Sequence, residues 1–322
     1  MKAMLLESIC QDLKMTETKI PVCGEENLLV RICATGLNFA DTLLMNGQYQ
    51  EKPQLPFAPG MEICGIIVEI GSKVNGFKKG EKVISYIGYG GLAQYTSVLA
   101  DDCIKIPSNF SSIEISSLMI TYGTSEIALH QKAKLLSTET LLVMGASGGV
   151  GLTAVELGKI TGAKVIGVAR GKDKCKILKS YGVDLIIDSD NGNLVSEVKE
   201  FGGADVIYDP VGGEKFSLLM KVANFNARIL PIGFASGQIP QIPANIIMVK
   251  NLTVIGVHLG AYKKFQPHVI SGSLMNLVDM FAKKLIRPHV SNIFPLEKAN
   301  EALVLIRERK SIGKVVISIS ED

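Results

Sequence analysis

The sequence predicts an α/β protein of two domains, one rich in short strands and one built on a doubly wound parallel sheet. Three observations predict this. The chain has 322 residues, which is about twice the length of a typical domain. Before about residue 110, short apolar runs alternate with Gly and Pro, which is typical of antiparallel strands. After that point, continuous apolar runs alternate with helices, which is typical of a parallel sheet covered on both faces.

The first part of the chain is expected to form an antiparallel, barrel-like domain. Prolines 53, 56 and 59 indicate an extended loop in front of Gly60, because proline fixes the backbone and removes a hydrogen-bond donor. The short apolar segments on either side of this loop are expected to be strands at 28–32, 62–70, 82–86 and 93–98.

The second part opens with a helix expected over 113–132, and strands and helices then alternate. The apolar runs are short and are bounded by Gly, Asp or Asn, so they predict strands buried on both faces. The expected strands are 141–144, 164–169, 185–187, 205–209, 228–232 and 253–256, and the expected helices are 150–158, 172–181, 193–201 and 214–224.

The end of the chain is expected to be helical over 273–285 and 296–309 and to finish in a strand at 314–319. A lone terminal strand needs a sheet to join, and the sheet of the first domain is the natural host. The expected division is therefore nested, with one domain formed by residues 1–118 and 265–322 and the other by residues 119–264.

Composition and charge exclude several classes of protein. The chain is 47% hydrophobic and carries 34 Lys and Arg against 31 Asp and Glu, so it is expected to fold and to bind no nucleic acid. No apolar window is long enough to predict a membrane span or a signal peptide. The six cysteines include no CxxC pair and are expected to be reduced thiols in a cytoplasmic protein.

The most informative segment follows the strand at 141–144. It reads A-x-G-x-x-G at positions 146, 148 and 151, where the usual dinucleotide motif has a first glycine. Gly148 lets the backbone approach a pyrophosphate, and Gly151 lets the following helix pack close to the strand. The N-terminus of that helix then presents N–H groups to the phosphates. The segment therefore predicts a dinucleotide-binding Rossmann domain.

The residues after the next strand indicate which dinucleotide is bound. An NAD site usually has an acidic residue about 20 residues further on, where it holds the ribose 2′-hydroxyl. Here that place is occupied by Ala169 and Arg170, and Lys172 and Lys174 follow. Arg and Lys can pair with a 2′-phosphate, so NADP(H) is favoured over NAD(H).

With these motifs in place, the sequence resembles the zinc-independent quinone oxidoreductases, the zeta-crystallin-like branch of the medium-chain dehydrogenase/reductases. The resemblance covers nearly the whole chain and implies a GroES-like catalytic domain, a Rossmann domain and a homodimer. A strand beginning at Thr253 would lie at the edge of the Rossmann sheet and could pair across the two-fold axis. Besides the glycine motif, the segments that carry the resemblance are 36–42, 46–49, 56–62, 90–95, 208–213, 233–237 and 250–256.

Departures from the zinc-dependent members of the superfamily predict that no metal is bound. Asn38 and Gly60-Met61-Glu62 stand where those members carry Cys and Gly-His-Glu, and neither Asn nor Met is a usual zinc ligand. A four-cysteine structural lobe is also missing, since only Cys103 occurs between residues 80 and 110. We therefore expect NADPH as the cofactor, without zinc and without flavin.

The resemblance implies which residues form the site. Asn38 could donate an N–H to the acceptor oxygen, Tyr49 could donate an O–H or form a wall for a ring, and Thr124 could bind cofactor or acceptor. Asp41 is left out of the catalytic set. Ser189 stands where the family often has a Tyr that holds the 2′-phosphate, and Arg170 could compensate. The expected cofactor-binding residues are Ala146, Ser147, Gly148, Gly149, Val150, Gly151, Arg170, Lys174, Ser189, Gly212, Gly233, Phe234 and Gly256.

The expected activity is NADPH-dependent reduction of a quinone, by hydride transfer without a metal. The completing proton would come from solvent, because the sequence contains no convincing acid–base pair. Two alternatives stay open: reduction of the C=C bond of an alkenal or enone by the same residues, and a protein that binds NADPH and has an RNA-binding or structural role with little turnover. The sequence does not determine the acceptor.

Overall fold

The computed structural model describes residues 1–321 and divides into two compact units. Unit 1 consists of Met1–Ile120 together with the chain from Pro288 onward, and unit 2 is Thr121–Arg287. The nested arrangement expected from the sequence is therefore present. The second boundary lies later in the chain than the expected position at 264.

Unit 1 is built on a seven-stranded sheet in the order β14-β15-β3-β4-β5-β7, with β6 paired to β3 and a separate hairpin of β1 and β2. All pairs in the larger sheet are antiparallel except β14 with β15. The strands are β1 (Lys2–Leu5), β2 (Lys14–Glu17), β3 (Asn27–Leu37), β4 (Glu62–Ile70), β5 (Lys82–Tyr86), β6 (Tyr95–Leu99), β7 (Cys103–Ile106), β14 (Val290–Pro295) and β15 (Lys314–Ser318).

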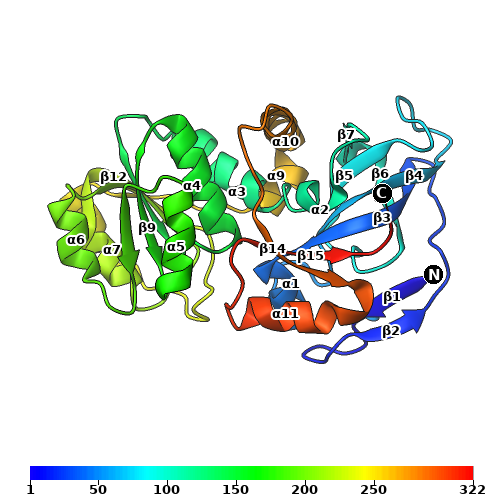
Figure 1. Ribbon diagram of the computed structural model, residues 1–322, viewed down its shortest axis with the longest axis horizontal. Coiled ribbons are helices and arrows are strands. Elements are labelled where there is room, and N and C mark those ends of the chain that lie inside the picture. Colours follow the sequence, from blue (N-terminus) through cyan, green and yellow to red (C-terminus); the bar gives the residue numbers. More distant parts are fainter. Residues whose placement is uncertain (322) are drawn as a thin grey trace. The chain divides into compact units, whose positions relative to one another are not determined.

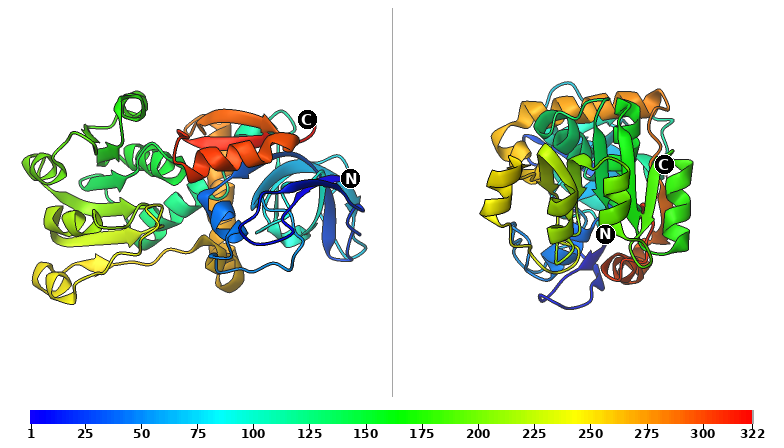
Figure 2. Two further views of the ribbon diagram at one scale, coloured as in Figure 1. Left: turned by 90° about the horizontal axis from the view of Figure 1, so that it is seen from below. Right: turned by 90° about the vertical axis from the view of Figure 1, so that its left-hand side faces the viewer.

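The terminal strand β15 pairs antiparallel with β3 over Val315–Ser318, as the sequence predicts. Figures 1 and 2 show the red end of the chain returning to the blue and cyan strands of unit 1. The helices of this unit are α1 (Phe39–Met45), α2 (Ser112–Ile115) and α11 (Ala299–Arg307), with 3₁₀ turns at Ala100–Asp102 and Leu296–Lys298.

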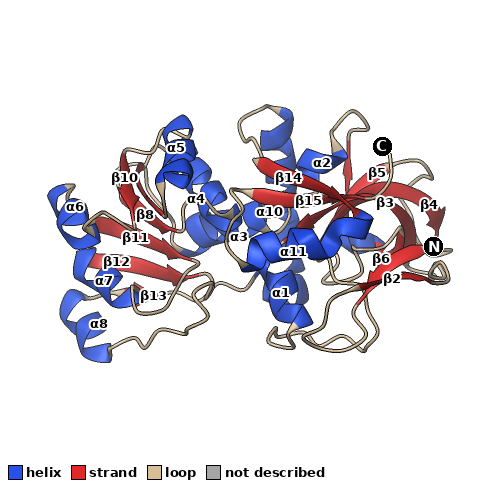
Figure 3. Cartoon of the chain, turned by 60° about the horizontal axis from the view of Figure 1, so that its bottom comes forward, coloured by secondary structure: helices blue, strands red, loops and turns tan. Residues whose placement is uncertain are grey.

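Unit 2 contains a six-stranded parallel sheet in the order β10-β9-β8-β11-β12-β13, with helices on both faces (Figure 3). This is the predicted doubly wound fold. Its strands are β8 (Thr140–Met144), β9 (Lys164–Ala169), β10 (Leu185–Asp188), β11 (Ala204–Asp209), β12 (Ala223–Pro231) and β13 (Thr253–Val254). Its helices are α3 (Thr121–Glu126), a π-helix (Ile127–Lys132), α4 (Gly149–Thr161), α5 (Lys172–Ser180), α6 (Leu194–Glu200), α7 (Phe216–Val222), α8 (Ala244–Lys250), α9 (Leu259–Phe265) and α10 (Pro267–Ala282).

The core of unit 2 explains why the apolar runs in the sequence are continuous. Leu142, Ile166, Ile207 and Ile229 lie on four neighbouring strands and are fully buried in one cluster with Phe216 of α7. A parallel sheet with helices on both faces buries its central strands on both sides, so the alternation typical of a half-exposed strand is lost there.

The helix expected over 113–132 is interrupted. The structure has α2 at Ser112–Ile115 and then a break before α3 at Thr121. In the break, the backbone N–H of Ile120 donates to Glu62 Oε2 at 2.9 Å instead of to a helical carbonyl. A carboxylate 58 positions earlier in the chain therefore takes the hydrogen bond that would continue the helix.

The helices α9 and α10 belong to unit 2, which moves the second boundary from the expected 264 to Arg287. A side chain at Gly123 of α3 would meet Leu259 of α9 and Leu274 of α10, so the three helices are closely packed. Ser273 of α10 also donates a hydrogen bond to the buried Glu126 of α3.

Within residues 1–321, no helix has the length and hydropathy needed to cross a membrane.

Candidate functional site: a nucleotide cradle and a buried lysine network

The turn between β8 and α4 forms the cradle predicted from the glycine motif. Ala146 donates its N–H to Val168 O of β9 at 2.9 Å, and Gly148 donates to Gly145 O at 2.9 Å. Gly148 is the N-cap of α4, so the first N–H groups of this helix of 13 residues point out of the turn. A turn of this kind between a strand and a helix N-terminus fits a pyrophosphate.

Gly151 has a steric reason to be glycine. A Cβ there would lie 2.2 Å from Gly145 O and 2.9 Å from the Ala146 Cα, so any side chain would force α4 away from β8. Ala146, which replaces the first glycine of the motif, is fully buried. A methyl group is therefore accommodated at the first position of the motif but not at the last.

The end of the sheet formed by β9 and β10 brings together the residues expected to select the nucleotide. Ser189 donates its N–H to Ala169 O at 2.8 Å, which places it beside Arg170. Arg170 is exposed and Lys174 is half-buried on α5. Asp188, which the sequence analysis did not assign, accepts the Gly171 N–H at 2.9 Å. The pKa of Asp188 is lowered, first by this bond and then by the N–H of Asp190.

The turn after β11 contributes three more of the expected residues. Asp209 is buried, and its carboxylate accepts the N–H groups of Val211 at 2.9 Å and Gly212 at 3.1 Å. A side chain at Gly212 would meet the ring of Phe234, and the Gly233 N–H donates to Asp209 O. Gly212, Gly233 and Phe234 therefore lie together.

Gly256 and Thr124 do not lie in the turns that contain the other expected residues of unit 2. Gly256 follows β13, is exposed, and has no heavy atom within 4 Å of where a Cβ would be, so the structure shows no close approach there. Thr124 is buried in α3. Its neighbour Ser125 bonds to Tyr208 and Thr153 hydroxyls at 2.9 and 2.8 Å, which fixes this helix on the Rossmann sheet.

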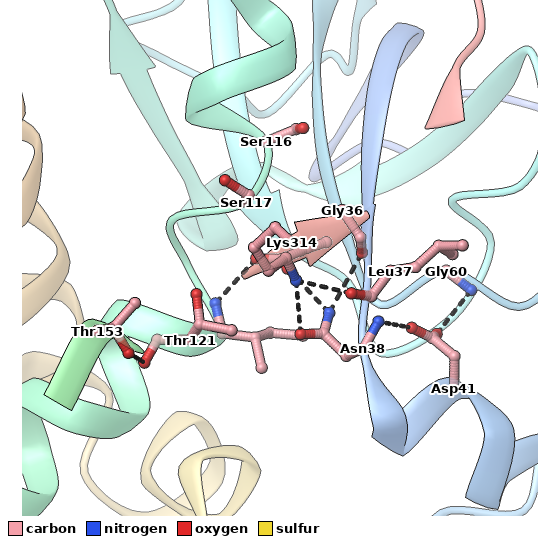
Figure 4. A network of polar contacts seen from close by, with 12 residues as sticks. Gly36, Leu37, Asn38, Asp41, Gly60, Ser116, Ser117, Thr121, Thr153 and Lys314 are labelled. Carbon is pink, nitrogen blue, oxygen red and sulfur yellow. Dashed lines mark hydrogen bonds and ion pairs between the residues drawn. The ribbon is translucent and has the colours of Figure 1, made fainter. Parts of the chain in front are cut away.

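In unit 1, a buried lysine organises the region of Asn38 (Figure 4). Lys314, the first residue of β15, donates from Nζ to Glu62 Oε1 at 2.8 Å, to Asn38 Oδ1 at 2.7 Å and to Leu37 O at 2.8 Å. The side chains of Lys314 and Glu62 are only 5% and 0% exposed. The three donors of the ammonium group are thus matched by three oxygens, which is what a buried charge requires.

This network determines how Asn38 is oriented. Because Lys314 can only donate, the atom of the Asn38 amide that faces it must be the oxygen. The amide nitrogen then donates to Glu62 Oε1 at 2.8 Å and to Gly36 O at 3.2 Å. Both N–H donors of Asn38 are therefore used within the protein, and the structure does not support the expectation that Asn38 donates to an acceptor oxygen.

Gly36 makes room for the network. A Cβ at this position would lie 2.6 Å from Ser116 O and 2.8 Å from Glu62 Oε1, so a side chain would displace the carboxylate from Lys314 and Asn38. The glycine of the sequence motif at 36–42 therefore has a packing role.

Asp41 lies beside this network as part of the cap of α1. Its Oδ2 accepts the Asn38 N–H at 2.8 Å and its Oδ1 accepts the Gly60 N–H at 3.0 Å. The carboxyl group is fully buried, and this desolvation raises its pKa to about 7, against the opposing effect of the two N–H bonds. Asp41 therefore joins α1 to the loop at Gly60.

Tyr49 follows α1 and is half-buried. Its hydroxyl is hydrogen-bonded to the hydroxyl of Tyr86, a buried residue at the end of β5. Burial raises the pKa of both phenols, so both are protonated at neutral pH. Tyr49 thus carries a neutral hydroxyl group that is hydrogen-bonded to the neutral hydroxyl group of Tyr86.

The residues present do not fit a zinc ion at the place where zinc-dependent relatives would hold one. Met61 is buried, and Asn38 bonds to the ammonium of Lys314. A positive charge already contacts the oxygens of Asn38 and Glu62, and a thioether and an amide are poor donors for zinc. Among residues 1–321, no group of three or more His, Cys, Asp and Glu side chains could hold a metal.

Sequence reasoning missed three residues that the structure brings into these regions. Lys314, Tyr86 and Asp188 all act through partners that are distant in sequence or belong to another strand. The only signal for Lys314 was its position at the start of a strand that had to join the sheet of unit 1.

Comparison with known proteins agrees with the fold and the cradle. Residues 24–108 match the family model for the alcohol dehydrogenase GroES-like domain, and residues 149–273 match the model for zinc-binding dehydrogenases. The chain is 43% identical over 304 residues to a quinone oxidoreductase-like protein 2 homolog of Nematostella vectensis, which covers 92% of this chain and 83% of the relative. It is 30% identical over 309 residues to a quinone oxidoreductase of Mus musculus, with coverage of 94% and 92%.

A solved structure has the same fold over nearly the whole length of the chain. The quinone oxidoreductase of Thermus thermophilus, whose crystal structures include a complex with NADPH, superimposes with a TM-score of 0.87 at 26% identity, covering 99% of this chain and 100% of that one. These matches define an oxidoreductase fold of the medium-chain dehydrogenase/reductase type. Within it, the chain belongs to the quinone oxidoreductase-like family.

Proposed function

We propose that this protein is an NADPH-dependent reductase that transfers hydride to a quinone without zinc. The observation that carries the proposal is the cradle at 146–151 with cationic side chains beside it at the end of β9. The names of its relatives and the NADPH complex of the Thermus thermophilus enzyme support the proposal. NADPH, when bound, supplies the hydride.

In unit 2, the residues of the chain bind and orient the cofactor. The N-terminus of α4 would hold the pyrophosphate, and Arg170 and Lys174 would pair with the 2′-phosphate. The turn with Gly212, Gly233 and Phe234 would approach the nicotinamide end, because it follows the next strand of the sheet.

In unit 1, we propose Tyr49 as the group that donates a hydrogen bond to the acceptor oxygen. The hydrogen bond to Tyr86, which is buried at the end of β5, holds the Tyr49 hydroxyl in place, and burial raises the pKa of that hydroxyl and keeps it protonated at neutral pH. Asn38 supports the backbone from which α1 begins and does not contact the acceptor. The completing proton would come from solvent, and Thr124 would assist in binding.

A panel of acceptors tests the proposal. Oxidation of NADPH and of NADH should be measured with 1,4-quinones and with alkenals, using the purified full chain. The expected result is turnover of quinones with NADPH, and an acceptor rate that falls in Tyr49→Phe but not in Tyr89→Phe, an exposed tyrosine of the same unit. Faster turnover of alkenals would indicate C=C reduction instead. Cofactor binding without oxidation of any acceptor would contradict both.

A further inference from the structure

Lys215, which lies directly before α7, reaches across to the end of a different strand. Its Nζ donates to Ser189 O at 3.2 Å, although the two residues are 26 positions apart. Ser189 follows β10 and is itself bonded through its N–H to Ala169 O at the end of β9. The ammonium group of Lys215 is therefore held at the carboxyl ends of β9 and β10, the edge at which ligands of open parallel sheets bind.

Within residues 1–321, Lys215 forms no salt bridge. Asp188, which precedes Ser189 in the chain, is held by its own loop: its Oδ1 accepts the N–H groups of Gly171 and Asp190 at 2.9 and 3.1 Å. Its Oδ2 accepts the side-chain N–H of Asn191 at 3.2 Å. Among residues 1–321, no carboxylate forms an ion pair with Lys215, whose bond to Ser189 O uses one of its three donors.

The other cations of this edge come from the β9–α5 segment, whereas Lys215 comes from the β11–α7 segment. Arg170 and Lys172 follow β9, and Arg170 is exposed. A phosphate monoester carries nearly two negative charges and three acceptor oxygens, and it binds best where cations approach from more than one direction. The bond to Ser189 O favours one position of the exposed Lys215 side chain before any ligand arrives, which reduces the entropy lost on binding.

From this placement, we propose that Lys215 is a further specificity-determining residue, which binds the 2′-phosphate of the cofactor and distinguishes NADPH from NADH. The proposal rests on the proposed function, because it assumes that the adenosine end of NADPH lies at this edge of the sheet. It adds to Arg170 and Lys174 a third cationic contact, from a residue outside the glycine motif and outside the segment after β9.

Calorimetric binding of two small ligands tests the role of Lys215 without any turnover. Adenosine 2′,5′-bisphosphate carries the 2′-phosphate, and 5′-ADP lacks it. In Lys215→Met the affinity for the bisphosphate should fall about tenfold, as expected for one charge-assisted phosphate contact, and the affinity for 5′-ADP should not change. Lys215→Arg should retain most of the bisphosphate affinity, because the charge is kept.

Lys221→Met is the matched control, since Lys221 is an exposed lysine of α7, the helix that Lys215 precedes. It should bind both ligands as the unmodified protein does. Unchanged bisphosphate affinity in Lys215→Met, or an equal loss for both ligands, would overturn the assignment of Lys215. If the unmodified protein itself binds the two ligands equally, then the NADPH preference in the proposed function is wrong, which is a distinguishable result.

Discussion

At the scale of single residues, the buried ion pair of Lys314 and Glu62 is expected to contribute to the stability of unit 1. Both groups are buried, and removal of one partner leaves the other charge without compensation. Lys314→Met should lower the free energy of unfolding of unit 1 by about 3–5 kcal/mol, measured by urea denaturation. The double variant Lys314→Met with Glu62→Gln should recover part of this loss, because the uncompensated charge is gone.

The control for this prediction is Lys105→Met. Lys105 is paired with Glu81 at 3.3 Å on the surface, where both side chains are partly exposed. A surface pair of this kind contributes at most about 1 kcal/mol. A loss in Lys314→Met no larger than in Lys105→Met would show that the buried network does not stabilise unit 1.

Asp41 predicts a dependence of stability on pH. Burial raises its folded-state pKa to about 7, above its ordinary value of 3.8, so the folded state binds the proton more tightly than the unfolded state. The stability it contributes is fully present below about pH 4 and is lost as the pH rises through 7, by about 4 kcal/mol at most. Asp41→Asn should flatten this fall in urea midpoints measured between pH 5 and 8.

Asp188 serves as a control of opposite sign for Asp41. Its pKa is lowered, so its contribution is present above its ordinary pKa and is lost as the solution becomes acidic. Asp188→Asn should therefore leave the change between pH 5 and 8 intact. If stability does not decrease over this range in the unmodified protein, the raised pKa of Asp41 is contradicted.

Residues of the site could be predicted from sequence only where a local motif carried them. The glycines at 148 and 151 were found because their spacing reflects a single turn, and the structure places them there. Lys314 could not be found in this way, since a lysine between Gly313 and Val315 has no local sign of burial. Its partners are 252 and 276 positions away, and only the pairing of β15 with β3 brings them together.

At the scale of elements, the two glycines of the cradle should respond differently to alanine. A Cβ at Gly151 would lie 2.2 Å from a backbone oxygen, whereas one at Gly148 would lie 3.3 Å from it, with ordinary φ and ψ at that residue. Gly151→Ala should lower the melting temperature and abolish NADPH binding. Gly148→Ala should keep a melting temperature close to that of the unmodified protein and still bind NADPH more weakly.

Differential scanning calorimetry and NADPH fluorescence titration distinguish the two variants. Equal stability in both would contradict the argument that α4 packs against β8 only because residue 151 has no side chain. Undiminished NADPH affinity in Gly148→Ala would show that the backbone at 148 does not approach the pyrophosphate.

The sequence missed several elements of both kinds, namely the strands β1, β2, β7 and β14 and the helices α1, α8 and α9. The bounds of β4, β5 and β9 agree with the expected ranges, because each begins at a charged residue and a Gly or Arg follows within two residues of its end. Two of the differences concern helices near Asn38 and Glu62: the helix expected over 113–132 is interrupted, and α1 was not predicted. Glu62 interrupts the first, and the second has only seven residues, stabilised by the reciprocal bonds of Asn38 and Asp41. The break before α3 and the helix α1 both depend on polar hydrogen-bond partners, which the spacing of apolar residues along the sequence does not reveal.

At the scale of the whole molecule, the homodimer expected from the family remains a proposal. It is supported by the position of β13 at the edge of the Rossmann sheet. Met248 and Val249 of α8 are 71% and 72% exposed on the neighbouring helix, where an apolar surface is costly in a monomer. Val249→Lys should therefore convert a dimer into a monomer in analytical ultracentrifugation, whereas Lys221→Glu on α7 should leave the mass unchanged. A monomeric unmodified protein would contradict the proposal.

The pairing of β15 with β3 has a consequence for the order in which the protein is completed on the ribosome. The strand β3 is made early, but its partner β15 begins only at Lys314, after all of unit 2 has been synthesised. At roughly 5–20 residues per second, the nascent chain carries an unfinished sheet edge for many seconds while the inserted Rossmann unit is able to fold. During this interval the carboxylate of Glu62 has no lysine partner. We therefore expect the early segment to depend on protection by chaperones until translation ends.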